Sequence, residues 1–229
     1  MIANIDRLLA AVLLMLVVTS SVRAQEPEDS LRVYAVEIVK TWPFQETLSG
    51  FGIYLGNGAV ISAAHVVGRW PLFSRPRVLV AGLDLPATII QMGSTNGIDV
   101  TLLTVDESRL PLALRMRRNP ICRTPPIVGE KVFGVTTEKV VPTHVLSPLF
   151  IPPHLRKEYG TLTSELVTPS GSGIFRGTTK CLLGIVSRSV HRYEFETTAG
   201  GVVEAHGGTA GYFVPAAEIL DFLPKAYRL

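Results

Sequence analysis

Two serines in the stretch TPSGSGIF, Ser170 and Ser172, are each followed by a glycine and are candidates for a nucleophile. A free serine hydroxyl is a weak nucleophile, so it needs a base that takes its proton and an acid that orients the base. A histidine is the usual base. The histidines of the chain are His65, His144, His154, His191 and His206.

His65 and Asp99 stand out from the other candidates by their settings. His65 ends the strand-like run GAVISAA, and Asp99 opens the apolar run DVTLLTV after the turn STNG. The remaining histidines lie in proline-flanked or polar segments. Taken alone, each residue also has an ordinary interpretation, His65 as a packed core residue and Asp99 as a turn or capping residue.

Metal chemistry has little support in the sequence, and we expect no metal and no cofactor. The chain has neither a CxxC nor an HExxH pattern. Its two cysteines, Cys122 and Cys181, are compatible with one disulfide in an oxidising compartment. The sequence does not show whether they lie close enough to bond.

The segments that must position these residues are short apolar or alternating runs separated by Gly, Pro and Asn, which indicate strands and turns. They are RVYAVEIVK, GFGIYL, GAVISAAHVV, RVLVAGL, ATIIQMG, DVTLLTV, KVFGVTT, THVLSPLF, SELVTP, CLLGIVSRSV, GVVEAH and GYFVP. Long helical periodicity is almost absent, so the fold class is expected to be all-β, a sandwich or a barrel. Only PAAEILDFLPKAYRL predicts a helix, which starts at Pro215 and stops at Pro224. The proline-rich RRNPICRTPPIVGE is typical of a connector between two β units.

The N-terminal segment is typical of an export signal, with Arg7, an apolar run over 8–18, and the small residue Ala24 before polar residues. A membrane span needs about 20 apolar residues, so a signal peptide over 1–24 is favoured over a membrane anchor. The mature chain, 25–229, is expected to be exported to a periplasm or secreted, with no stable membrane span after cleavage.

Composition limits the partners of the chain. An apolar content of 47% in 229 residues is enough to bury a core in one or two domains. The formal net charge of +3 is mild, and the basic cluster LRMRRNPICR has no interleaved aromatic residues. A cluster of this kind is usually a solvated surface, so no nucleic-acid partner is expected. The oligomeric state is not indicated.

Three blocks of the sequence resemble the trypsin-like (chymotrypsin-fold) serine proteases, in that family's order. GFGIYLGNGAVISAAHVV resembles their Ala-Ala-His block, GIDVTLLTV their Asp strand, and SELVTPSGSGIFRGTTKCLLGIVS their nucleophile block. Separations of 34 residues from His65 to Asp99 and 71 from Asp99 to Ser170 are short, as in compact bacterial members. VGEKVFGV and GYFVPAAEILDFL are similar to elements of the bacterial high-temperature-requirement proteases. The resemblance extends over about 49–223.

This resemblance implies two six-stranded antiparallel β-barrels and a short C-terminal helix, with a polypeptide substrate bound between the barrels. His65 and Asp99 would come from the first barrel and the serine from the second. The expected bounds are about 31–116 for barrel one, 117–126 for the linker, 127–215 for barrel two and 216–223 for the helix.

The register of the nucleophile favours Ser170 over Ser172. With Ser170 as nucleophile, the pattern Ser-Gly-Ser-Gly matches the small residues that the family places after its serine. With Ser172, the β-branched Ile174 would occupy a place where the family has Gly or Ser, in a tight turn. Ser172 is then expected to be a turn residue whose hydroxyl bonds locally.

The residues before the nucleophile depart from the family. The expected oxyanion hole consists of the backbone N–H groups of Thr168 and Ser170, but the family has Gly at the position of Thr168 and Asp at that of Pro169. Proline biases the preceding residue toward extended dihedrals, and threonine tolerates positive φ poorly. A hole that needs positive φ would therefore be distorted, or would form only when substrate binds.

Cleavage-site preference is left open. The resemblance puts Ser164 near the base of the specificity pocket and the residues from Ser187 to Ser189 along the strand that pairs with substrate. No buried acid suited to Lys or Arg is evident. His191 and His206 are compatible with a glutamate preference or with a plain surface location.

Two functions remain from the sequence. The first is an exported serine endopeptidase that uses His65, Asp99 and Ser170. The alternative is a catalytically silent homologue that binds a peptide or protein. A third class, a ligand-binding β-barrel, would have a wide apolar lumen and no triad geometry.

Overall fold

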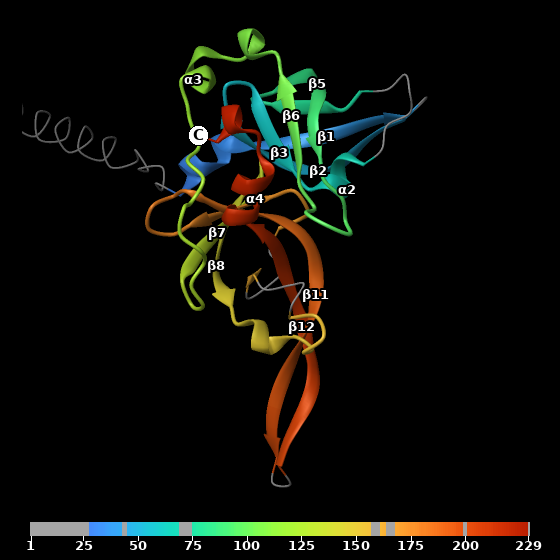
Figure 1. Cartoon of the computed structure of the whole chain (residues 1–229), viewed down its shortest axis with the longest axis vertical. Coiled ribbons are helices and arrows are strands. Elements are labelled where there is room, and N and C mark those ends of the chain that lie inside the picture. The colour runs from blue at the N-terminus through green and yellow to red at the C-terminus, as the bar shows by residue number, and fades with distance from the viewer. Residues whose placement is uncertain are drawn as a thin grey trace, which may run out of the picture. The chain divides into compact units, whose positions relative to one another are not determined.

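Two closed six-stranded antiparallel barrels make up the computed structural model of the chain (Figure 1). The structure describes residues 28–42, 45–68, 75–156, 161–163, 168–198 and 201–228. The predicted signal peptide lies outside them. Residues 31–229 form one unit. The all-β class with paired barrels, predicted from the sequence, is confirmed.

The first barrel has the strand order β1-β2-β3-β6-β5-β4. Its strands are β1 (Ala35–Trp42), β2 (Gln45–Gly56), β3 (Ala59–Ser62), β4 (Arg77–Val80), β5 (Leu83–Met92) and β6 (Thr101–Val105). The tight turn between β2 and β3 contains Asn57 and Gly58, both with positive φ, a conformation that Asn and Gly adopt most readily. Fully buried residues on β2, β3 and β6, such as Ile53, Ile61 and Leu102, fill this barrel.

The second barrel has the order β10-β11-β12-β9-β8-β7. Its strands are β7 (Lys131–Val135), β8 (Val140–Leu146), β9 (Leu162–Thr163), β10 (Gly173–Arg176), β11 (Leu182–Thr198) and β12 (Gly201–Pro215). The runs GVVEAH and GYFVP, expected as two strands, belong to the single strand β12. Phe133, Phe175 and Phe213 are fully buried and lie in one hydrophobic cluster with the core of the first barrel.

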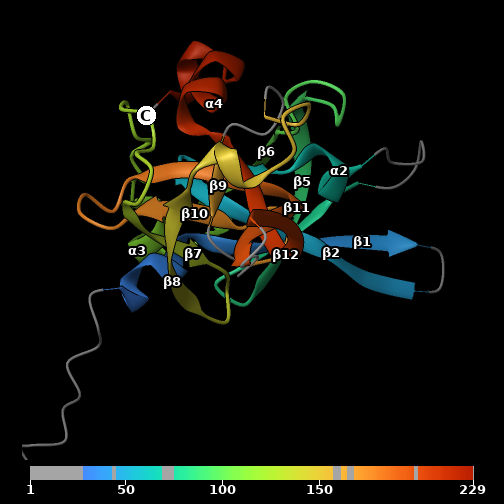
Figure 2. The same ribbon diagram turned by 90° about the horizontal axis from the view of Figure 1, so that it is seen from below.

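Short helices flank the strands. They are η1 (Asp29–Tyr34), α2 (Ala64–Val67), η2 (Glu107–Arg109), α3 (Leu112–Arg115), η3 (Pro148–Phe150), α4 (Ala216–Phe222) and η4 (Lys225–Tyr227). The start of the predicted strand RVYAVEIVK is helical, because η1 extends to Tyr34. Helix α4 follows Pro215, as its sequence predicts, and packs on β11 and β12 through the buried Ile219 (Figure 2).

Candidate active site

His65 and Asp99 are joined by two hydrogen bonds in the first barrel. His65 lies on the single turn α2 that follows β3, and Asp99 lies just before β6, the strand that pairs with β3. The Nδ1 atom of His65 is 2.7 Å from Oδ2 of Asp99, and the His65 backbone N–H donates to Oδ1 at 3.0 Å. The ring and the main chain of His65 are thus both held by one carboxylate.

Asp99 is buried, whereas the His65 side chain keeps 35% of its surface exposed. The hydroxyl of Ser187 also donates to Oδ2 of Asp99, at 2.5 Å. Burial alone raises the pKa of Asp99, but the hydrogen bonds from the His65 ring, Ser187 and the His65 N–H, together with the histidine charge, outweigh burial and hold this pKa below its usual value. Asp99 is therefore an ionised, fixed acceptor beside an accessible imidazole.

Ser170 is the second residue of the tight turn that begins at Pro169 and leads into β10. The turn is closed by a hydrogen bond from the Ser172 N–H to the Pro169 carbonyl at 3.2 Å. Gly171 has a φ of 86°, as the third residue of a type II turn requires. A Cβ added there would lie 1.9 Å from the Phe51 carbonyl oxygen, so no other residue fits. The Phe51 N–H in turn donates to the Ser170 carbonyl at 3.1 Å, which fixes the turn against strand β2 of the first barrel.

The two serines of the turn differ in access. Ser170 is partly exposed, and its hydroxyl donates to the Ser187 carbonyl at 2.8 Å. Ser172 is fully buried, and its hydroxyl oxygen has no hydrogen-bond partner among the described residues, so the local bond expected for it is not observed. Only Ser170 can meet a substrate without unfolding of the turn.

Ser187 links the candidate residues. Its hydroxyl bonds Asp99, and its carbonyl accepts the Ser170 hydroxyl. The structure therefore brings Ser170, Asp99 and His65 around one residue, but within the described part of the chain the Ser170 hydroxyl is bonded to that carbonyl and not to the His65 ring. The sequence placed Ser187 only on a substrate-pairing strand, and its contact with Asp99 was missed.

Thr168 immediately precedes the turn that contains Ser170, and it does not have the positive φ that glycine can adopt. The positive-φ residues other than glycine in the described chain are Asn57, Ala81 and Lys180, so Thr168 has the negative φ that its place before Pro169 favours. Thr168 is buried, and its hydroxyl oxygen lacks a partner among the described residues.

The other predicted site residues are more scattered. Ser164 lies outside the described residues, and Ser189 is exposed on β11. His144, on β8, and His154 are exposed. His191 and His206 lie on β11 and β12. His65 is the histidine that the structure shows hydrogen-bonded to Asp99.

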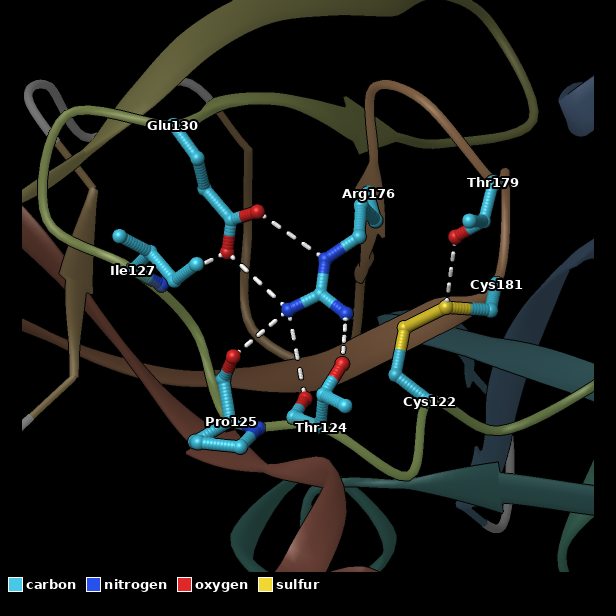
Figure 3. The surroundings of a disulfide bond; sticks show 8 residues. All are labelled: Cys122, Thr124, Pro125, Ile127, Glu130, Arg176, Thr179 and Cys181. Atoms are coloured by element: carbon cyan, nitrogen blue, oxygen red, sulfur yellow. Dashed lines mark hydrogen bonds and ion pairs between the residues drawn. A yellow bond between two sulfur atoms is a disulfide. The ribbon is translucent and has the colours of Figure 1, made fainter.

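A disulfide and a buried arginine fasten the linker between the barrels to the hairpin that carries the serine turn (Figure 3). Cys122 and Cys181 form a disulfide with Cα atoms 5.2 Å apart. Beside it, Arg176 at the end of β10 makes an ion pair with Glu130 at 3.0 Å and donates to the Thr124 hydroxyl. The connecting turn of the β10–β11 hairpin, which Arg176 and Cys181 flank, is therefore held by covalent and ionic contacts. The Ser170 turn lies at the other end of β10.

Neither a metal-binding cluster nor a membrane-spanning helix is present among the described residues. No group of three or more His, Cys, Asp or Glu side chains there could hold a metal ion. None of the helices in that part of the chain has the length and apolar character needed to cross a bilayer.

No protein-family model matches the sequence, and no curated protein matches it. Solved structures do match. The active form of the Rv3671c protease from M. tuberculosis has a TM-score of 0.55 and 17% identity, over 86% of this chain and 82% of that one.

Two further solved structures give similar results. Kallikrein-related peptidase 10 in complex with Zn2+ matches with a TM-score of 0.59 and 15% identity, over 86% of this chain and 96% of that one. Neuropsin, a serine protease expressed in mouse brain, matches with a TM-score of 0.56 and 13% identity, over 83% of this chain and 92% of that one. At such low identity the likeness shows the fold, and this chain has the chymotrypsin fold of these proteases.

Proposed function

We propose that this protein is an exported serine endopeptidase in which Ser170 is the nucleophile, His65 the general base and Asp99 the residue that orients His65. The observation that carries the proposal is the pair of hydrogen bonds between His65 and the buried Asp99. Ser187 links this pair to the accessible Ser170, because its hydroxyl donates to Asp99 and its carbonyl accepts the Ser170 hydroxyl. A core histidine or a capping aspartate needs no such arrangement. The disulfide is compatible with an oxidising compartment and hence with export.

In the proposed reaction the Ser170 hydroxyl leaves the Ser187 carbonyl and turns toward His65. Its oxygen attacks the scissile carbonyl carbon while His65 takes the hydroxyl proton, and His65 then gives that proton to the amine nitrogen as the C–N bond breaks. Water attacks the resulting acyl-enzyme, again with His65 as base, and Ser170 recovers its proton. Asp99 holds the imidazole in the required tautomer and stabilises its protonated form.

The backbone N–H groups of Thr168 and Ser170 would stabilise the oxyanion that forms on the substrate carbonyl. Each such donor typically contributes about 3 kcal/mol to the stability of the transition state. Because Thr168 has a negative φ, we propose that this hole is completed when substrate binds rather than beforehand.

The negative φ of Thr168 also favours a second candidate function, that of a silent homologue that binds a polypeptide without cleaving it. In that case Thr168 and Pro169 would keep the oxyanion hole closed, and the Ser170 hydroxyl would stay on the Ser187 carbonyl. The intact set of His65, Asp99 and Ser170 favours the enzyme.

A fluorophosphonate probe separates the two candidates, because it forms a covalent bond only with an activated serine. We expect the purified protein to be labelled, and mass spectrometry to place the label on Ser170. Ser170→Ala should abolish labelling, while Ser172→Ala, which changes a buried serine two residues away, should retain it. Labelling of Ser170→Ala would overturn the choice of nucleophile, and an unlabelled wild-type protein that still binds unfolded polypeptide would favour the silent homologue.

A further inference from the structure

Strands β11 and β12 continue far beyond the second barrel as a two-stranded ribbon (Figure 1). They stay paired from Val190 and Ala210 to Thr198 and Gly201. On the outer side of β11, β10 reaches only as far as Ile185, and on the outer side of β12, β9 reaches only Gly211 and Tyr212. Within the described residues, both edges of the ribbon therefore lack a neighbouring strand.

The outer edge of β11 starts at the candidate nucleophile. The backbone of Val186 is bonded on this side to Ser172 and Gly171, and the next carbonyl, that of Ser187, accepts the Ser170 hydroxyl. A register shift between Val186 and Arg188 makes Ser187 the extra residue of a bulge. The N–H and C=O of one residue in a strand point to the same edge, and those of the next residue point to the other. From Ser189 onward, every second residue of β11 therefore points its N–H and its C=O toward the outer edge of the strand, the same edge on which the Ser187 carbonyl lies.

An open edge of this kind is a template for another strand. Proteins usually protect such edges with proline, charged side chains (lysine above all), bulges or a covering segment. The sequence between Val190 and Gly211 contains neither proline nor lysine, and its charged residues are Arg192, Glu194, Glu196 and Glu204. At about 3.4 Å per residue, the edge from Ser189 to Thr198 is about 30 Å long. It can therefore pair with about ten residues of an extended chain.

Chain direction decides which part of a substrate would occupy this edge. β11 runs away from Ser170, so a polypeptide that pairs antiparallel with it runs toward Ser170 and delivers its C-terminal end to the nucleophile. The resemblance already implies that the segment from Ser187 to Ser189 pairs with substrate. We propose that the β11 edge beyond it, from Val190 to Thr198, binds the residues further upstream of the scissile bond, as a third strand added to the ribbon. This inference rests on the proposed function, because it names the substrate of the same site as a long, extended polypeptide recognised through its main chain.

Peptide length tests the inference directly. Two peptides share the same scissile sequence and carry either four or twelve residues before the cleaved bond. Because each additional main-chain hydrogen bond contributes a several-fold gain, we expect kcat/KM of the longer peptide to be about 100-fold higher. Scrambling the eight added residues, with proline avoided, should preserve most of the gain, since the backbone is what the strand recognises.

N-methylation of single peptide bonds provides the sharper form of the test. Methylation removes one N–H donor, and only alternate residues of an added strand point their N–H toward β11. When the added residues are N-methylated one at a time, kcat/KM should therefore fall at every second position and stay nearly unchanged at the positions between. A uniform loss, or no loss, would contradict strand addition.

A shortened ribbon supplies the matched protein variant. Residues 192–208 are replaced by Asn-Gly, a two-residue turn that closes the pair of His191 and Thr209. We expect this variant to keep fluorophosphonate labelling and hydrolysis of the short peptide, and to lose the advantage of the longer one. Retained labelling shows that the variant is folded at the site.

The outcomes separate this inference from the proposed function. An unlabelled wild-type protein overturns the proposed function. Labelling and short-peptide hydrolysis with no effect of length overturn the inference alone. Light scattering after gel filtration provides one more outcome. A wild-type dimer that becomes monomeric when the ribbon is shortened would assign the edge to a second copy of the chain and so overturn the inference as well.

Discussion

The two halves of the candidate site differ in how completely their polar groups are paired. In the first barrel, the buried carboxylate of Asp99 is bonded by the His65 ring, the His65 backbone and Ser187. In the second barrel, the Ser170 hydroxyl is bonded to a main-chain carbonyl, and the adjacent Thr168 is buried with an unpartnered hydroxyl oxygen among the described residues. Under the function that we propose, this difference means that His65 and Asp99 are held in place before substrate arrives, and that the Ser170 hydroxyl and the oxyanion hole reach their working arrangement afterwards.

The largest effect is expected from a change that disrupts the interaction between Asp99 and His65 in the first barrel. Asp99→Asn keeps the size of the side chain but presents an amide to His65, which favours the wrong imidazole tautomer. We expect kcat/KM to fall about 10⁴-fold, as for other triads of this type. Peptide hydrolysis by purified variants measures the change.

The control for this variant is Asp106→Asn, which changes an exposed carboxylate that caps η2 on the same barrel. It should leave kcat/KM unchanged. A loss below tenfold in Asp99→Asn would mean that Asp99 holds the fold of the loop and does not act through His65.

The positions of His65 and Asp99 could be singled out from the sequence, because His65 ends a strand-like run and Asp99 opens one. Their roles, and the turn at Ser170 in the second half of the site, were predicted only from the resemblance to the family blocks, because His65 and Asp99 each have an ordinary local interpretation as well. The choice of Ser170 over Ser172 rested on the small residues that the turn needs, and the close approach of Gly171 to the Phe51 carbonyl provides the physical reason.

Features that depend on distant pairing could not be predicted in this way. The contact of Ser187 with Asp99 requires the β11 bulge, and no local pattern specifies a bulge. The ribbon was not predicted, because the glycines between GVVEAH and GYFVP separated these two runs in the sequence. In the structure Gly208 lies opposite the irregularity between His191 and Arg192, and pairing continues on both sides of it.

A smaller effect is expected from removing one partner of the paired carboxylate. Because the pKa of Asp99 in the folded protein lies below its usual value, ionised Asp99 contributes stability above about pH 4, and this contribution is lost as the pH falls through the folded pKa. Ser187→Ala removes one hydrogen bond to the charged oxygen. We expect it to lower the free energy of unfolding by about 2 kcal/mol at pH 7 and by less at pH 3. Urea denaturation at the two pH values measures the difference.

Ser189→Ala is the matched control, because it changes an exposed serine two residues along the same strand. It should be neutral at both pH values. An equal loss for Ser187→Ala at pH 7 and pH 3 would assign its effect to the cavity left in the core rather than to the hydrogen bond with Asp99.

The smallest effect is expected from a change at Thr168, in the half of the site that the second barrel contributes. Thr168→Gly removes the steric cost of positive φ, which is about 1 to 2 kcal/mol for a residue with a side chain, so the oxyanion hole should form more readily. We expect kcat to rise about tenfold while the free energy of unfolding falls by about 0.5 to 1 kcal/mol, since glycine loses more backbone freedom on folding. Thr168→Ala separates the causes, because alanine lacks the hydroxyl and the β-branch but keeps the same restriction on φ. A rise in kcat for glycine alone would assign the restraint to the backbone. A fall in kcat for both variants would show instead that the buried Thr168 hydroxyl contributes to the site, and the two halves would then be equally complete before substrate binds.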